Sequence, residues 1–117
     1  MQPRHPMIRT SVAALAALGV AAVAHAQGGP IKIGVLAPLT GPLASPGAEM
    51  VNGWKLFWEQ AGGTAGGRKV EYQVADTTCN PDQALAQARR LVLQEKVDFL
   101  VGPLCGHEGP AVAQVSK

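Results

Sequence analysis

Apolar residues along this chain form short runs that alternate with segments of helical spacing. The first run of the main body, Ile31 to Ala37, is apolar except for Lys32 and a glycine, and prolines stand on both sides of it. A continuous apolar run of this length is typical of a strand that is buried on both faces of a parallel sheet. We therefore predict a central strand at this position.

A helix is predicted after the turn-rich segment Leu39 to Gly47. From Ala48 to Ala61 apolar residues recur at helical spacing, and four glycines between residues 62 and 67 end the pattern. The face they form consists of Val51, Trp54, Trp58 and Ala61. We interpret the two tryptophans as core residues, with an aromatic platform for a ligand as the alternative.

The next two elements have clear boundaries. Residues 70–75 alternate between apolar and polar side chains, which predicts a strand near the edge of the sheet. Asn80 then offers an N-cap, Pro81 suits the first helical position, and Gln83 has the capping-box spacing. A helix is therefore expected from Pro81 to about Glu95.

A third strand is predicted at Val97 to Val101, followed by a loop from Gly102 to Gly109 and a helix from Pro110 onward. The order β-α-β-α-β-α, with connections long enough for right-handed crossovers, predicts the α/β class with a doubly wound parallel sheet. Loops that leave the carboxyl ends of such strands line the ligand crevice. We expect the loops 39–47, 77–81 and 102–110 to share one edge.

The pattern stops before a complete domain is formed. Only eight residues follow from Pro110 to Lys117, and three strands are few for a sheet, whose mean is about five to six strands. We therefore expect residues 27–117 to be an incomplete N-terminal lobe of a longer protein.

Residues 1–26 have the pattern of an export signal. Arg4 and Arg9 are basic, residues 12–24 are apolar apart from one glycine, and Ala24-His25-Ala26 supplies the small residues that a signal peptidase recognises. The apolar stretch is shorter than the roughly 20 residues needed to cross a bilayer, which disfavours a transmembrane anchor. We predict cleavage after Ala26, export, and no stable membrane insertion afterwards.

Removal of that signal balances the charges. The whole chain has ten Lys or Arg and eight Asp or Glu, and the two surplus cations are Arg4 and Arg9. A protein that binds a nucleic-acid backbone needs a basic stripe. Here Arg68-Lys69 and Arg89-Arg90 are isolated pairs. We expect no nucleic-acid partner.

The two cysteines, Cys79 and Cys105, each follow a predicted strand. Thiols of exported proteins usually form disulfides, so a Cys79–Cys105 disulfide is the preferred interpretation. Free buried thiols, and a metal site that includes His107 or Asp76, are the alternatives. We expect no metal site, because the Cys105-x-His107 spacing is tighter than usual ligand spacings and there is no second cysteine pair.

The loops contain no nucleotide-binding motif, since neither glycine-rich loop holds G-K-[ST], or G-x-G-x-x-G after its strand. His107 beside Glu108 suggests a general base, but sequence neighbours seldom point at the same atom and no nucleophile with an oxyanion arrangement accompanies them. We interpret the pair as exposed loop polarity or, for His107, as a ligand contact. The sequence predicts no enzyme and no cofactor.

Five motifs in order resemble the leucine/isoleucine/valine-binding family of periplasmic solute-binding proteins. They are IKIGVLAPLTGP at residues 31–42, Asn52-Gly53, Gly62-Gly63, DTTCNP at 76–81 and VGPLC at 101–105. The resemblance implies two α/β lobes, joined by a hinge, that close on a small solute in the periplasm and deliver it to an ABC permease in the inner membrane. At about 150 residues per lobe, this chain would be roughly the first third.

The resemblance also implies ligand contacts. In the family the residue after the second cysteine contacts the ligand carboxylate, and the residue before the glycine that opens the first helix forms part of a ligand wall. The amino-acid binders resemble each other in a hydroxyl residue at the first position and an aromatic at the second. Here these positions hold Gly106 and Pro46. Only backbone donation remains at Gly106, and His107 offers an imidazole donor.

The expected ligand-binding residues are therefore Ser45, Pro46, Gly106 and His107. The expected ligand is a branched-chain amino acid or a related small carboxylate or amide, aromatic acids included. Two alternatives use a similar architecture: an extracellular ligand-sensing domain of a receptor or of an amide or urea sensor, and a secreted α/β hydrolase. The hydrolase needs a G-x-S-x-G elbow, which this sequence lacks.

Overall fold

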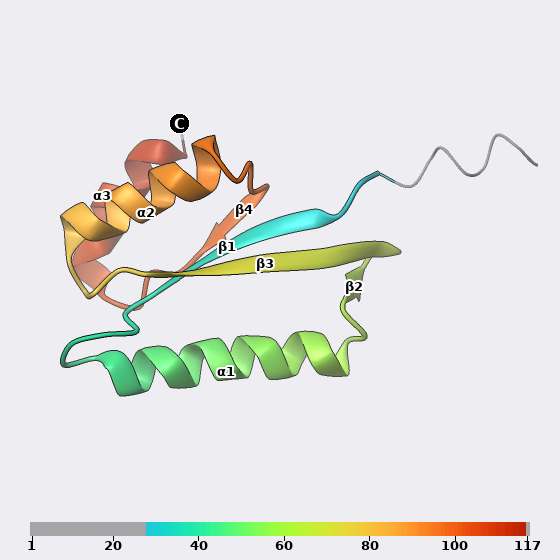
Figure 1. Cartoon of the computed structure of the whole chain (residues 1–117), viewed down its shortest axis with the longest axis horizontal. Coiled ribbons are helices and arrows are strands. Elements are labelled where there is room, and N and C mark those ends of the chain that lie inside the picture. Colours follow the sequence, from blue (N-terminus) through green and yellow to red (C-terminus); the bar gives the residue numbers. More distant parts are fainter. Residues whose placement is uncertain (1–27, 117) are drawn as a thin grey trace, which may run out of the picture.

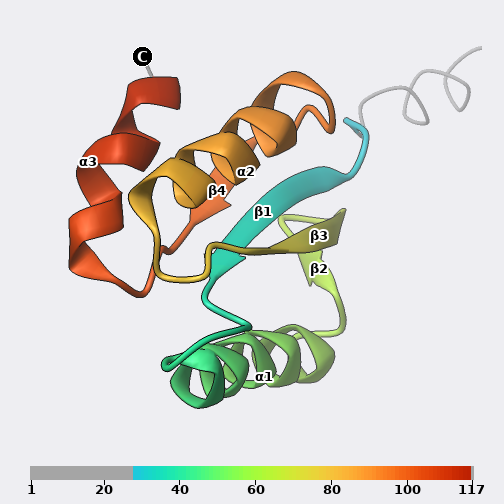
Figure 2. The same ribbon diagram turned by 60° about the vertical axis from the view of Figure 1, so that its left-hand side comes forward.

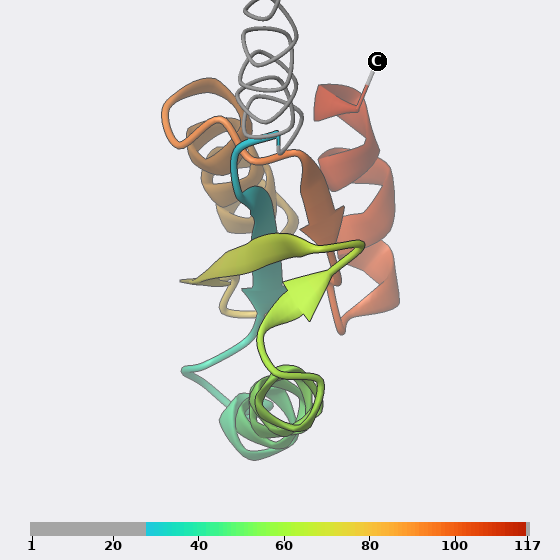
Figure 3. The same ribbon diagram turned by 90° about the vertical axis from the view of Figure 1, so that its right-hand side faces the viewer.

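The computed structural model describes residues 28–116, so the expected signal peptide and its cleavage site lie outside the described residues. The described part is a small sheet with helices on both faces. Helix α1 covers one face, and α2 and α3 cover the other (Figure 1, Figure 3). This arrangement confirms the predicted α/β class.

Strand β1 (Ile31–Ala37) is the centre of the sheet. It pairs in parallel with β3 (Arg68–Asp76) along its whole length and with β4 (Phe99–Val101) on its other side. Five consecutive residues of β1, from Ile33 to Ala37, are buried, as its continuous apolar run predicts. The strand is thus buried on both faces, between the two helical layers (Figure 2).

One strand was not predicted. The two-residue β2 (Thr64–Ala65) pairs antiparallel with the start of β3 and gives the order β2-β3-β1-β4. The turn between β2 and β3 consists of Gly66 and Gly67, both with positive φ, which suits a tight hairpin. The glycine-rich segment was predicted only to end the helix, because glycine has low strand propensity.

Helix α1 (Ala44–Gln60) begins four residues before the predicted Ala48. Ser45 and Pro46 therefore lie in its first turn and not in the preceding loop, which corrects the prediction. Proline is tolerated there because first-turn N–H groups have no partner within the helix. The predicted core face is confirmed at Val51, which is buried, whereas Ala61 lies after the helix and is exposed.

The aromatic residues of α1 pack against the sheet. Trp54 contacts both Trp58 and Tyr72 edge to face, at centroid distances of 5.9 and 6.3 Å. Both tryptophans are partly buried and pack against the part of the core that lies between α1 and the sheet. The core interpretation is therefore confirmed.

Helix α2 (Pro81–Leu93) starts as predicted and ends two residues earlier. The side chain of Asn80 accepts hydrogen bonds from the N–H groups of Asp82 and Gln83, at 2.9 and 3.1 Å. Its buried face, Ala84, Ala88 and Leu91, packs on Leu36 of β1 and Ala75 of β3.

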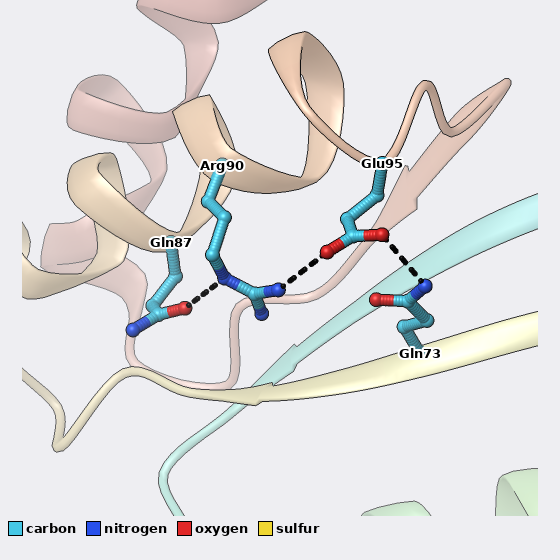
Figure 4. A network of polar contacts seen from close by, with 4 residues as sticks. All are labelled: Gln73, Gln87, Arg90 and Glu95. Carbon is cyan, nitrogen blue, oxygen red and sulfur yellow. Dashed lines mark hydrogen bonds and ion pairs between the residues drawn. The ribbon is translucent and has the colours of Figure 1, made fainter.

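A polar network fixes the far end of α2 to the sheet (Figure 4). Arg90 donates hydrogen bonds to Gln87 and Glu95, both at 3.1 Å, and Glu95 accepts one from Gln73 of β3, also at 3.1 Å. Exposed ion pairs contribute little individually, so the network mainly positions the turn that follows α2.

The last elements differ in their bounds from the prediction. Strand β4 is limited to three residues, because Asp98 instead holds the start of β1. The Asp98 carboxylate accepts a hydrogen bond from the Lys32 N–H group, and the Asp98 N–H group donates one to the Lys32 carbonyl, at 2.8 Å each. The predicted loop to Gly109 ends at Cys105. There the chain enters η1 (Gly106–Glu108), α3 (Gly109–Val112) and η2 (Ala113–Val115). Among residues 28–116, no helix has both the length and the apolar character of a membrane span.

Two glycines of α1 give a matched test of its packing. A Cβ on Gly47 would collide with the backbone carbonyl of Pro38, whereas one on Gly53 would meet no atom within 4 Å. We expect Gly47→Ala to destabilise the protein by about 1–3 kcal/mol through overpacking. Gly53→Ala should stabilise it by about 0.5–1 kcal/mol through helix propensity. Denaturant unfolding measures both, and equal effects would contradict the close contact at Gly47.

Candidate ligand-binding edge

The loops after β1, β3 and β4 emerge at one edge of the sheet, on the left of Figure 1. All three strands are parallel, so their carboxyl ends meet there. This confirms that the three predicted loops share an edge, which is where open parallel sheets bind ligands.

Asp76, the last residue of β3, organises this edge. One carboxylate oxygen accepts hydrogen bonds from the N–H groups of Leu39 and Thr78, at 2.7 and 2.8 Å. The other accepts one from the Thr40 hydroxyl at 2.6 Å. A single carboxylate therefore connects the loop after β1 to the loop after β3. From the sequence, Asp76 was expected only as a possible metal ligand; its position at the end of a strand is the signal for this role.

These contacts change the acidity of Asp76. Burial acts to raise the pKa of its carboxyl, but the hydrogen bonds from the Thr40 side chain and from neighbouring backbone N–H groups lower it by more. The pKa therefore lies below the ordinary value of an aspartate, and the residue is ionised at neutral pH.

A disulfide joins Cys79 and Cys105, with a Cα–Cα distance of 5.7 Å. It connects the loop after β3 to the loop after β4, as predicted. Both thiols are consumed by this bond, which excludes the free-thiol and metal-thiolate alternatives. Within the described residues, no group of three or more His, Cys, Asp and Glu side chains is placed to hold a metal ion.

His107 lies over this disulfide. Its Nε2 is 3.0 Å from the carbonyl oxygen of Cys79 and 4.0 Å from the Cys79 sulfur, and the side chain is otherwise exposed. A carbonyl only accepts hydrogen bonds, so Nε2 carries the hydrogen. The imidazole donor expected for a ligand is thus already engaged within the protein.

Gly106, immediately after Cys105, is exposed, and a Cβ there would meet no atom within 4 Å. Gly106 and His107 are the first residues of η1, and their backbone N–H groups have no hydrogen-bond acceptor among the described residues. Two adjacent donors at the exposed edge suit an anion such as a carboxylate.

The other two predicted ligand residues lie elsewhere on the edge. Ser45 and Pro46 are exposed in the first turn of α1, which covers the opposite face of the sheet from α3 (Figure 1). No hydrogen bond joins either of them to Gly106 or His107 among the described residues. The four predicted residues therefore come from two elements, α1 and η1.

Glu108 corrects one interpretation. It was predicted as exposed loop polarity, but none of its surface is exposed, and neither carboxylate oxygen has a hydrogen-bond partner among the described residues. The helical turn of η1, which the sequence did not predict, rotates this side chain inward while His107 stays outside.

A family model described as periplasmic binding protein matches residues 30–116. The chain belongs to the periplasmic binding protein family. A relative from Rhizobium johnstonii named Leu/Ile/Val-binding protein is 36% identical over 100 residues, which is 83% of this chain and 26% of the relative. The resemblance seen in the five sequence motifs is thus confirmed.

Solved structures agree with this assignment. An ABC transporter substrate-binding protein from Sphaerobacter thermophilus is 36% identical with a TM-score of 0.69, over 74% of this chain and 23% of that one. A solute-binding protein of an ABC transporter from R. palustris, in complex with 4-hydroxybenzoate, is 32% identical with a TM-score of 0.69, over 74% and 24% of the chains.

These periplasmic binding proteins are much longer than the present chain, which spans about a quarter of the length of the relatives it matches. The family is a non-enzymatic family of substrate-binding proteins. Membership in it implies a periplasmic location.

The hydrogen bonds of Asp76 lead to a pH-dependent prediction. Because its pKa is lower in the folded state, its stabilisation is fully present above the unfolded pKa and is lost as the pH falls through the folded value. We expect Asp76→Asn to lower the free energy of unfolding by about 1–2 kcal/mol near neutral pH. The difference should shrink below about pH 4.

The control for this variant is Glu49→Gln, which removes an exposed carboxylate of α1 that has no hydrogen bond among the described residues. Urea unfolding at several pH values measures both. A loss of stability in Asp76→Asn that is equal at pH 7 and pH 3 would show that the charge of Asp76 has no part in it.

Proposed function

We propose that this chain is the first part of the periplasmic substrate-binding component of an ABC importer, which captures a small carboxylate solute between two lobes. Residues 1–26 are the signal peptide, and residues 27–117 belong to the N-terminal lobe. The rest of the site lies in sequence beyond this chain, and the partner is an ABC permease of the inner membrane.

One observation carries this proposal: the adjacent N–H groups of Gly106 and His107, which have no acceptor among the described residues, lie at the carboxyl edge of the sheet. The Cys79–Cys105 disulfide holds this point in place. Backbone donors that need no rearrangement bind an anion at low entropic cost. They suit the carboxylate of an amino acid or of an aromatic acid equally well.

Apolar side chains on the same edge support a ligand with a hydrocarbon body. Leu39 and Leu43, after β1, and Leu104, after β4, are exposed although they are large and hydrophobic. Pockets for small ligands are mostly apolar with a few placed polar groups. These leucines would contact the carbon skeleton while the backbone donors hold the carboxylate.

Two similar proteins point to two kinds of acid. The R. palustris structure contains 4-hydroxybenzoate, and the R. johnstonii relative is named for leucine, isoleucine and valine. We propose that the ligand of this chain belongs to one of these two groups. The absence of a hydroxyl side chain at Gly106 leaves more room than a serine would, which favours the aromatic acids.

Calorimetric titration of the protein, expressed from its complete reading frame and without its signal peptide, tests the function. We expect saturable binding of leucine or of 4-hydroxybenzoate. If neither acid binds, nor isoleucine, valine or benzoate, the proposed ligand class is wrong.

The backbone donor can be tested with a matched pair at position 106. Cys105 has φ −82° and ψ 117°, a conformation that allows a following proline. Gly106→Pro removes the N–H group and adds a ring, whereas Gly106→Ala keeps the N–H group and adds a Cβ that would meet no atom within 4 Å. We expect a loss of affinity of about tenfold or more for the proline variant. The alanine variant should bind within about threefold of the wild type, and equal affinities would exclude N–H donation at Gly106.

A further inference from the structure

We infer that His107 is a specificity-determining residue, which selects acids that carry a second hydrogen-bond donor by accepting that bond at Nδ1. The donor is a hydroxyl or an ammonium group of the ligand. This inference rests on the proposed function, because it describes the same ligand at the same edge.

The first step is the tautomer of His107. The carbonyl oxygen of Cys79, 3.0 Å from Nε2, can only accept a hydrogen bond. Nε2 therefore carries the hydrogen. A neutral imidazole has one N–H group, so its Nδ1 is a hydrogen-bond acceptor.

The second step is that Cys79, whose carbonyl orients the imidazole, is itself held in place by two contacts. Cys79 is fixed by its disulfide to Cys105, only two residues before His107. Its N–H group also lies 3.4 Å from the hydroxyl oxygen of the buried Thr77. The carbonyl that orients the imidazole is thus part of a braced loop, and the ring has little freedom to exchange its two nitrogens.

The third step is that Nδ1 is available. His107 is exposed, and its Nδ1 makes no hydrogen bond among the described residues. The bonds of one residue place Nδ1 within about 5 Å of its own backbone nitrogen. That nitrogen is a proposed carboxylate donor, so one small acid can contact both atoms.

The consequence is a selection by chemical class. A carboxylate has no hydrogen and cannot satisfy Nδ1, whereas an ammonium or hydroxyl group of the same ligand can. A site that hydrogen-bonds such a group discriminates strongly against analogues that lack it, because the polar atom of the site would lose its partner. Amino acids and hydroxylated aromatic acids should therefore bind better than the same acids without the donor.

Two ligand pairs test this selection on the protein from its complete reading frame. Leucine is compared with 4-methylpentanoate, and 4-hydroxybenzoate with benzoate, which distinguishes an ammonium from a hydroxyl donor. We expect the wild type to prefer the donor-bearing member of at least one pair by about tenfold.

Two variants separate the nitrogens of His107. His107→Gln places an amide N–H near the former Nε2, so it can still donate to Cys79, but it has no acceptor at the Nδ1 position. His107→Asn places an amide oxygen near the former Nδ1 and cannot reach Cys79. We expect the preference to disappear in His107→Gln, and to persist in His107→Asn with weaker overall binding.

The outcomes are distinct. Binding without preference in the wild type, or an unchanged preference in His107→Gln, overturns the inference while the proposed function stands. If none of the four acids binds, and isoleucine and valine do not bind either, the proposed function is overturned and the inference with it. A ¹H–¹⁵N spectrum of the wild-type imidazoles, with the His107 ring assigned through its correlations to its own backbone, gives an independent test. Hydrogen on Nδ1 instead of Nε2 would overturn the inference whether or not the variants fold.

Discussion

The pairing of β1 with a parallel strand on each side determines where everything else in this structure lies. β3 and β4 both run in the direction of β1, so the three chain reversals that matter for binding occur at one edge. The burial of β1 under helices on both faces makes that register costly to shift, because a slip of one residue would exchange the side chains of the two cores. The site therefore depends on a strand that contributes no side chain to it.

Two kinds of connection hold the edge loops, and they act between different pairs. Asp76 links the loop after β1 to the end of β3 by hydrogen bonds, while the disulfide links the loop after β3 to the loop after β4. The first depends on pH and the second on redox conditions, so neither replaces the other. Together they connect all three loops through β3 and the residues that follow it, which makes that segment the common support of the edge.

The strongly patterned parts of the fold were predictable, and the local details of the site were not. The apolar run of β1 and the cap at Asn80 act within a few residues, so the sequence alone indicated them correctly. The early start of α1 and the inward turn of Glu108 depend on contacts with distant residues, which periodicity does not record. The hydrogen bond that engages His107 is of the same kind, because Cys79 lies 28 residues earlier in the chain.

The close contact between Gly47 and the carbonyl of Pro38 has a consequence for how the segment from Pro38 to Gly47 can change between related proteins. Pro38 is fixed by the end of β1, and the next two residues are held by Asp76, so α1 is seated directly against the strand that precedes it. The chain between these two anchors, the residues held by Asp76 and the contact at Gly47, therefore has a fixed length. Exchange of exposed side chains, such as those of Ser45 and Pro46, leaves both anchors intact, whereas an insertion would have to break one of them. Divergence among proteins built in this way should therefore be found in residue identity and not in loop length.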